Sequence, residues 1–180
     1  MRYLDIICES VPSSPEFQQW FKGSKVVDKQ GQPLRMFHGT HGDFQLPLQT
    51  FTHFGTAEAA DQRLFGKHGA AGSWQGPEAT LTMRPNARVY PVFLSIKKPY
   101  VFTDSGKNSY FEVLRKMGER HDPEGGSPKD YAKYIIQKLT ELGCDGLKYK
   151  NKFEDAGSIS WVVFSPEQVW HEFQGEPSSK

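Results

Sequence analysis

The sequence has few cysteines, no long apolar run and no excess of charge of either sign. Cys8 and Cys144 lie far apart and belong to no C-x-x-C or Cys/His ligand pattern, so neither a disulfide framework nor a zinc site is indicated. Lys and Arg total 22 against 21 Asp and Glu, which argues against a protein built for bulk binding of nucleic acid or anionic membranes. No segment reaches the roughly 20 apolar residues of a membrane-spanning helix. We therefore expect no metal and no membrane partner.

The first ten residues lack the apolar core of a secretory signal, because Asp5 and Glu9 interrupt the run. A chain of 180 residues with 37% hydrophobic residues fits one domain, which we expect over residues 1–174, followed by a disordered tail over 175–180. We expect a monomer in a reducing cytoplasm.

Short strands and separate helices alternate along the chain. A helix with an aromatic face starts near Ser13, whose spacing to Glu16 is that of a capping box. Two further amphipathic helices are predicted after Ser109 and Ser127, the second with Leu142 on its buried face. The predicted strands cover residues 25–28, 33–37, 51–54, 87–96, 146–149, 158–164 and 169–173. Pro91 places the strand over residues 87–96 at an edge or a bulge of its sheet. This pattern predicts an α+β domain.

Two of these strands end in a histidine followed closely by Gly-Thr. Leu34–Thr40 reads LRMFHGT and places His38 where a strand gives way to a loop, a usual location for binding side chains. Gly39 lacks a Cβ and would let a ligand approach the backbone. The second strand carries His53 and Phe54 before Gly55, and Thr56 can cap a helix. The competing interpretation is that His38 is a structural histidine before a turn, with its hydrogen bonds made within the protein.

Five segments in a fixed order carry a resemblance to a known family. They are F-x-x-W-F-K-G-S-K-V-V-D-x-x-G-x-P-L-x-x-F-H-G-T, H-F-G-T-x-E-A-A, V-Y-P-V-F-L-S-I-K-K-P, G-C-D-G-L-K-Y and W-V-V-F-S-P-E-Q-V. Together they resemble the ADP-ribosyltransferase domains of phage polyvalent proteins and related bacterial toxins. The resemblance runs from Phe17 to about Val169.

The resemblance implies two small split antiparallel sheets around a cleft for NAD⁺, with peripheral helices. NAD⁺ would be the substrate, and no metal would be needed. By the same resemblance, His38 would bond the adenosine-side ribose, the Gly39 backbone would pair with the nicotinamide carboxamide, and Thr40 would lie beside that ribose. Either His53 or Phe54 would stack on nicotinamide. Arg63 is a candidate for the pyrophosphate, which an arginine can bind with two parallel hydrogen bonds.

The chain departs from the family pattern at its glutamate. The polymerase-like branch opens its E-Y-V-V strand with a glutamate, whereas this chain has Ser160 before Trp161. A serine cannot supply the negative charge that stabilises an oxocarbenium-like state. Glu154 and Asp155 lie in the preceding loop and could reach back to supply the missing carboxylate, and Glu154 is the candidate that we select. A solvated loop acid is the competing interpretation of Glu154. Glu167, beyond the strand, is the weaker candidate.

The predicted function is therefore that of an NAD-dependent mono-ADP-ribosyltransferase with His38, His53, Glu154 and Ser160 as its catalytic group. Its acceptor would be a protein or a nucleic acid, and it would act as an effector of a phage or mobile element in the host cytoplasm. The missing glutamate favours an alternative, a catalytically inactive module that binds NAD⁺ or ADP-ribose or mediates an interaction. A tRNA 2′-phosphotransferase-like activity is a third alternative, although the arginine-rich pattern of that chemistry is absent.

Overall fold

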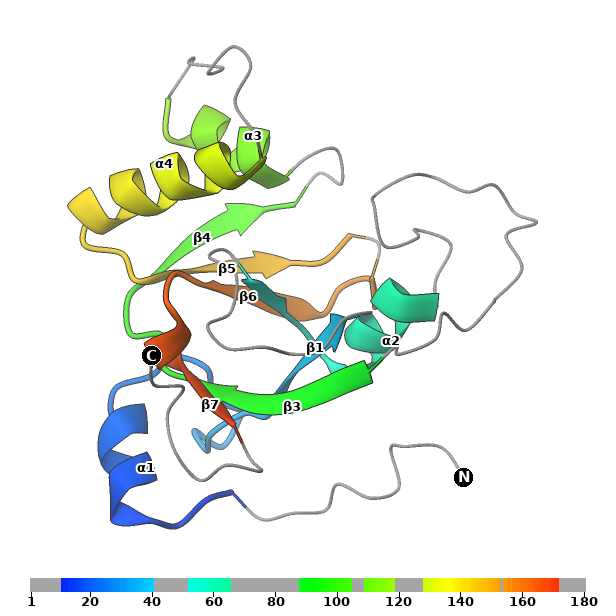
Figure 1. Cartoon of the computed structure of the whole chain (residues 1–180), viewed down its shortest axis with the longest axis vertical. Helices are drawn as coiled ribbons and strands as arrows, with labels where there is room; N and C mark the ends of the chain where they lie inside the picture. The colour runs from blue at the N-terminus through cyan, green and yellow to red at the C-terminus, as the bar shows by residue number, and fades with distance from the viewer. Residues whose placement is uncertain are drawn as a thin grey trace.

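The fold is built from two β-sheets that pack against each other and carry helices on their outer faces (Figure 1). This computed structural model describes residues 11–40, 52–65, 88–104, 109–118, 128–152 and 154–171. The predicted tail over 175–180 lies outside these ranges, as do residues 66–86 of the long Gly-rich loop that the sequence predicts over residues 65–86. The α+β class predicted from the sequence is confirmed.

The first sheet has the antiparallel order β1-β3-β7, with β1 Met36–Thr40, β3 Arg88–Leu94 and β7 Val169–His171. Pro91 lies in the central strand and pairs in continuous register with Phe37, so it is at neither the edge nor the bulge that the sequence predicted. It is tolerated because its partner in β1, Phe37, directs both backbone groups away from β3, toward Gly55. The Pro91 nitrogen therefore faces away from β1, so the missing N–H removes no hydrogen bond from the β1–β3 pair.

The second sheet has the order β2-β6-β5-β4. Its strands are β2 Thr52–Phe54, β6 Ile159–Val163, β5 Gly146–Lys150 and β4 Pro99–Thr103. The pair β4/β5 is parallel, which differs from the expected antiparallel sheets. Parallel neighbours need a long return connection, and here α3 (Ser109–Lys116) and α4 (Pro128–Glu141) supply it.

Strand β6 separates two of the three apolar cores, because successive side chains of a strand point to opposite faces of its sheet. Val162 faces α3 and α4, where it packs with Ile135 and Leu139. Trp161 and Val163 face the first sheet. Leu142, which the sequence predicted on the buried face of its helix, lies outside the core beneath α3 and α4. Helix α4 ends at Glu141, and Leu142 is 64% exposed.

The third core holds α1 (Pro15–Phe21) against the first sheet through Phe17, Phe93 and Trp170. The cap of α1 is Ser14, whose hydroxyl accepts from the Phe17 amide at 3.2 Å, rather than Ser13. Residues 25–28 form only an isolated bridge between Val27 and Pro33, so the predicted first hairpin is reduced to one pair. The remaining helical elements are α2 (Ala57–Phe65) and the short 3-10 helix η2 (Pro166–Gln168). No helix in the described ranges is long and apolar enough to span a membrane.

Candidate active site

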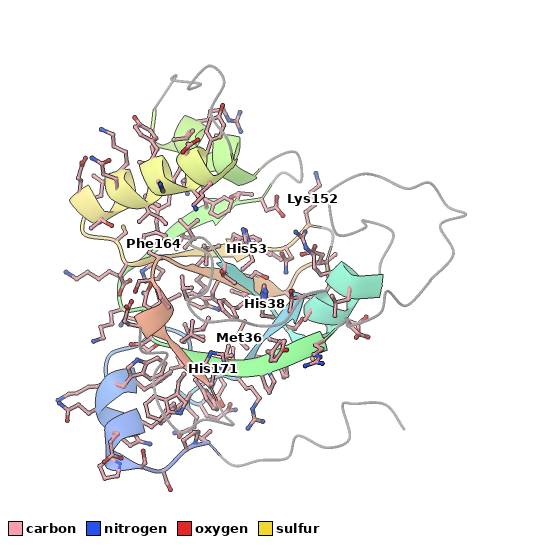
Figure 2. The ribbon with its side chains drawn as sticks, in the orientation of Figure 1. Met36, His38, His53, Lys152, Phe164 and His171 are labelled. Carbon is pink, nitrogen blue, oxygen red and sulfur yellow. The ribbon has the colours of Figure 1, made fainter. Side chains whose placement is uncertain are left out.

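The two sheets meet where Phe37 and Gly55 exchange two backbone hydrogen bonds of 2.9 and 3.0 Å. His38 follows Phe37 in β1, and His53 and Phe54 precede Gly55 in β2. The bridge therefore brings the two predicted histidines together between the sheets (Figure 2).

His38 is bound to the backbone of the second histidine. Its Nδ1 lies 2.8 Å from the His53 carbonyl oxygen, which can only accept, so Nδ1 carries the hydrogen. Its ring lies 5.5 Å from the Phe54 ring, centroid to centroid. Burial lowers the pKa of His38, the hydrogen bond to His53 partly offsets this, and the Arg63 charge lowers the pKa further. His38 is thus a neutral imidazole near pH 7.

His53 contacts a residue that the sequence analysis did not single out. Its Nδ1 lies 2.9 Å from the hydroxyl of Tyr149, a buried residue of β5. Burial is the main cause that lowers the pKa of His53 to about 4, with smaller effects from Arg63 and His38. Burial also raises the pKa of Tyr149, so its hydroxyl stays protonated. The sequence signal was a tyrosine on the apolar face of a strand, where a hydroxyl needs a partner.

Gly39 faces helix α2. A Cβ at this position would lie 2.5 Å from the Ala60 carbonyl oxygen and 3.0 Å from Leu64 Cγ. The absence of a side chain is thus explained by the packing of α2 on β1. Thr40 continues β1 opposite Arg88 and is partly buried.

Ser160 sits in β6 directly opposite Tyr149 and is 3% exposed. Its hydroxyl accepts from Asn151 Nδ2 at 2.7 Å. Asn151, which follows the last residue of β5, is the second residue that sequence reasoning missed. No pattern in the sequence indicates that its amide turns inward.

The loop that carries Glu154 is fastened to α2. Glu154 Oε1 lies 3.1 Å from Arg63 Nη1. Asp155 Oδ2 accepts from the Thr56 hydroxyl at 2.6 Å, and the Asp155 amide donates to Gln62 Oε1 at 2.7 Å. Asp155 has φ 47°, a left-handed conformation that aspartate tolerates.

These contacts gather most of the predicted site residues in one neighbourhood. The Arg63 charge acts on both histidines, and the Glu154 charge acts on Tyr149. Neutral imidazoles, one guanidinium and one carboxylate can hold a polar ligand and stabilise a developing positive charge. Within the described ranges, no group of three or more His, Cys, Asp or Glu side chains could hold a metal ion.

Glu167 lies elsewhere. It is exposed on η2, where its carbonyl oxygen accepts from Trp20 Nε1 at 2.9 Å. It also lines an open cavity of about 520 Å³ between α1, η2 and the end of α4. Neither histidine lines this cavity, so it is not the candidate site.

Comparison with known proteins agrees with the resemblance seen in the sequence. The model of a family described as "ADP-Ribosyltransferase in polyvalent proteins" matches residues 28–172, which include every predicted site residue. No curated protein and no solved structure matches the chain. The chain therefore belongs to the family of ADP-ribosyltransferases found in polyvalent proteins and is a transferase of ADP-ribose.

Proposed function

We propose that this chain is a mono-ADP-ribosyltransferase that uses NAD⁺ and modifies a protein or nucleic acid. In this reaction the bond between nicotinamide and ribose breaks, and nicotinamide leaves with the electron pair. The acceptor's nucleophilic atom then forms a bond with the positively charged anomeric carbon and gives up its proton. The site must therefore stabilise an oxocarbenium-like state.

One observation carries this proposal. The Arg63–Glu154 pair lies in the same electrostatic neighbourhood as the His38–His53 pair, at the junction of the two sheets. In this proposal His38 binds the adenosine-side ribose, with Thr40 beside it. Either His53 or Phe54 contacts nicotinamide, and the Gly39 backbone pairs with its carboxamide.

Glu154 supplies the negative charge that Ser160 lacks, and Arg63 controls when that charge is available. Without ligand, Arg63 is paired with Glu154, and the side chains are 53% and 24% exposed. An ion pair this exposed contributes only about 0–1 kcal/mol, so a better partner can replace it. The pyrophosphate of NAD⁺ can accept two parallel bonds from the guanidinium. Exchange of partners would free the Glu154 carboxylate for the reacting ribose.

The same pair also supports a second candidate function. If Arg63 keeps Glu154 neutralised when NAD⁺ binds, the site holds the dinucleotide without cleaving it, and the chain acts as a binding module. This alternative predicts tight NAD⁺ binding with no release of nicotinamide.

Incubation with adenylate-labelled NAD⁺ and cell lysate separates the two functions. The transferase predicts that label becomes attached to macromolecules together with release of nicotinamide. Protease would remove the label if the acceptor is a protein, and nuclease would remove it if the acceptor is a nucleic acid. Binding of NAD⁺ without nicotinamide release in any lysate would establish the binding module instead.

The biological setting that we propose is a phage or mobile-element effector, monomeric and active in the host cytoplasm. The family's occurrence in polyvalent proteins supports this setting.

A further inference from the structure

The exchange of partners proposed for Arg63 requires a second attachment for the loop that carries Glu154. Arg63 Nη1 lies 3.1 Å from Glu154 Oε1, and this contact is lost when the guanidinium turns to the pyrophosphate. A carboxylate on a loop released at that moment would no longer be held beside the reacting ribose. A misplacement of about 1 Å can cost about a hundredfold in rate. Contacts other than the ion pair must therefore keep the loop in place.

Asp155, the next residue along the chain, makes two such contacts. Its Oδ2 accepts from the Thr56 hydroxyl at 2.6 Å, a length typical of a charge-assisted hydrogen bond. Its amide donates to Gln62 Oε1 at 2.7 Å. We call these two contacts the Asp155 anchor. Neither of them involves Arg63, so both remain when Arg63 changes partner.

The two groups that bind Asp155 are themselves fixed by further hydrogen bonds. The Thr56 oxygen accepts from the Ala59 amide at 3.1 Å, so its hydroxyl hydrogen remains for Asp155. Gln62 Nε2 donates to Glu58 Oε1 at 2.8 Å, which leaves the Gln62 oxygen directed at the Asp155 amide. The anchor is therefore preorganised on the first two turns of α2.

The anchor lies beside the junction of the two sheets. Thr56 directly follows Gly55, whose backbone is bonded to Phe37, the residue before His38. Because Glu154 is covalently joined to Asp155, a bond between Asp155 and Thr56 keeps Glu154 close to this junction.

The backbone of Asp155 has an unusual conformation. Its φ of 47° is the one positive value at a non-glycine residue in the described ranges. Such a conformation persists where surrounding contacts enforce it, and it is found preferentially at functional sites. The Asp155 carbonyl accepts from the Ser158 amide at 2.9 Å, and the Ser158 carbonyl accepts from the Asn151 amide at 2.8 Å. The loop is thus bonded within itself, and Asp155 connects it to α2.

We propose that Asp155 is a positioning residue, which holds Glu154 at the sheet junction while Arg63 binds the pyrophosphate. This inference rests on the proposed function and deepens it, because the two acids of the loop receive different tasks. Glu154 carries the charge that acts on the ribose, and Asp155 acts only by keeping Glu154 in place.

Three substitutions separate this role from a general effect on the loop. Asp155→Gly keeps the left-handed backbone and removes the bond to Thr56, so kcat for nicotinamide release should fall about tenfold to a hundredfold, with the Kd for NAD⁺ nearly unchanged. Asp155→Asn keeps an oxygen that can accept from Thr56 and should recover most of the turnover. Ala156→Gly is the matched control, because it places a glycine at an exposed neighbour, and it should release nicotinamide at the wild-type rate.

A double substitution shows whether Asp155 acts through Glu154. In the Glu154→Gln background, Asp155→Gly should cause no further loss of turnover, since no carboxylate is left to position. An additive loss would overturn the proposal. An Asp155→Asn protein as inactive as Asp155→Gly would also overturn it, because the charge of Asp155 itself would then be required.

Hydrogen exchange of the amide of residue 155 tests the anchor without turnover. The protection factor should be the same in the wild type, in Ala156→Gly and in Arg63→Ala, and it should fall in Asp155→Gly. Loss of protection in Arg63→Ala would overturn the proposal, because the ion pair would then hold the loop. The expected exchange pattern in a protein that releases no nicotinamide would refute the proposed function and support the anchor.

Discussion

Burial holds both histidines of the site in the neutral state, and each is oriented by a different kind of partner. His38 donates to a backbone carbonyl, whereas His53 is paired with a tyrosine hydroxyl. A neutral imidazole has one donor and one acceptor, so these contacts help to set the orientation and polarity of each ring. At the residue scale, the hydrogen-bonding groups of both imidazoles are thus preorganised for a polar ligand.

Substitution of His38 tests whether this preparation serves NAD⁺. His38→Ala should weaken NAD⁺ affinity by about 1–3 kcal/mol, because a ligand hydroxyl would lose its buried partner. Isothermal titration calorimetry measures this loss. His171→Ala, which truncates a buried histidine of β7, is the control and should leave the affinity unchanged. Equal affinity in His38→Ala and wild type would make His38 a structural residue.

The pKa of His53 predicts how stability depends on pH. Its pKa is about 4 in the folded protein and ordinarily 6.5, so the unfolded chain binds more protons between these values. The contribution of His53 to the free energy of unfolding is therefore fully present above pH 6.5 and is lost as the pH falls toward 4. The loss from this group is up to about 3 kcal/mol. Urea unfolding at several pH values should show it, and His53→Gln should remove that part of the slope. An identical slope in the variant would contradict the assigned pKa.

At the scale of secondary structure, α2 is the element on which the site is assembled. Thr56, just before its first residue, donates a hydrogen bond to Asp155. The middle of the helix packs on Gly39, and its last turn carries Arg63. The loop before β6 and the end of β1 therefore keep their places through the same helix. A substitution that shifts the helix at its contact with Gly39 should therefore also shift its contact with Asp155, and the reverse.

Gly39→Ala tests the packing of α2 on β1. The new Cβ would lie 2.5 Å from a backbone oxygen, so helix and strand would have to separate. We expect the free energy of unfolding to fall by about 1–3 kcal/mol, as for other overpacked sites. Chemical denaturation provides the measurement. Unchanged stability together with abolished NAD⁺ binding would show instead that the glycine serves the ligand.

Arg63 variants test the exchange of partners between α2 and the loop. Arg63→Ala should raise the apparent KM for NAD⁺ by about tenfold to a hundredfold, the range for a lost charged hydrogen bond. Arg63→Lys should recover only part of it, since an ammonium cannot make two parallel bonds. Thermal stability should change little, because the ion pair is exposed. Full recovery of KM in Arg63→Lys would argue against bidentate binding of the pyrophosphate.

At the scale of the whole molecule, local pattern predicted much of the fold and less of the site. The strand predicted over residues 158–164 contains β6, in which the neighbouring residues Trp161 and Val162 lie in opposite cores, as the alternation of side chains along a strand requires. The position of Pro91 was mispredicted, because its tolerance in a central strand depends on the Phe37–Gly55 bridge, which the local sequence does not encode.

The pairing of His38 with His53 required the Phe37–Gly55 bridge, which joins two sheets and leaves no periodic signal. Tyr149 and Asn151 were missed for the same reason. Tyr149 looks like an ordinary strand residue, and Asn151 like an ordinary loop residue, until its partner from β2 or β6 is placed beside it. The sequence could identify the chemical groups, but the contacts that orient them belong to the tertiary structure.

The central claim is that Glu154 provides the charge for ADP-ribose transfer, and one pair of substitutions tests it most directly. Glu154→Gln should lower nicotinamide release by about two to three orders of magnitude while the dissociation constant for NAD⁺ changes little, since the carboxylate acts mainly in the transition state. Glu167→Gln, whose side chain lies on η2 outside the site, should release nicotinamide at the wild-type rate. A fully active Glu154→Gln protein, or a Glu167→Gln protein that is inactive while Glu154→Gln is not, would contradict the account.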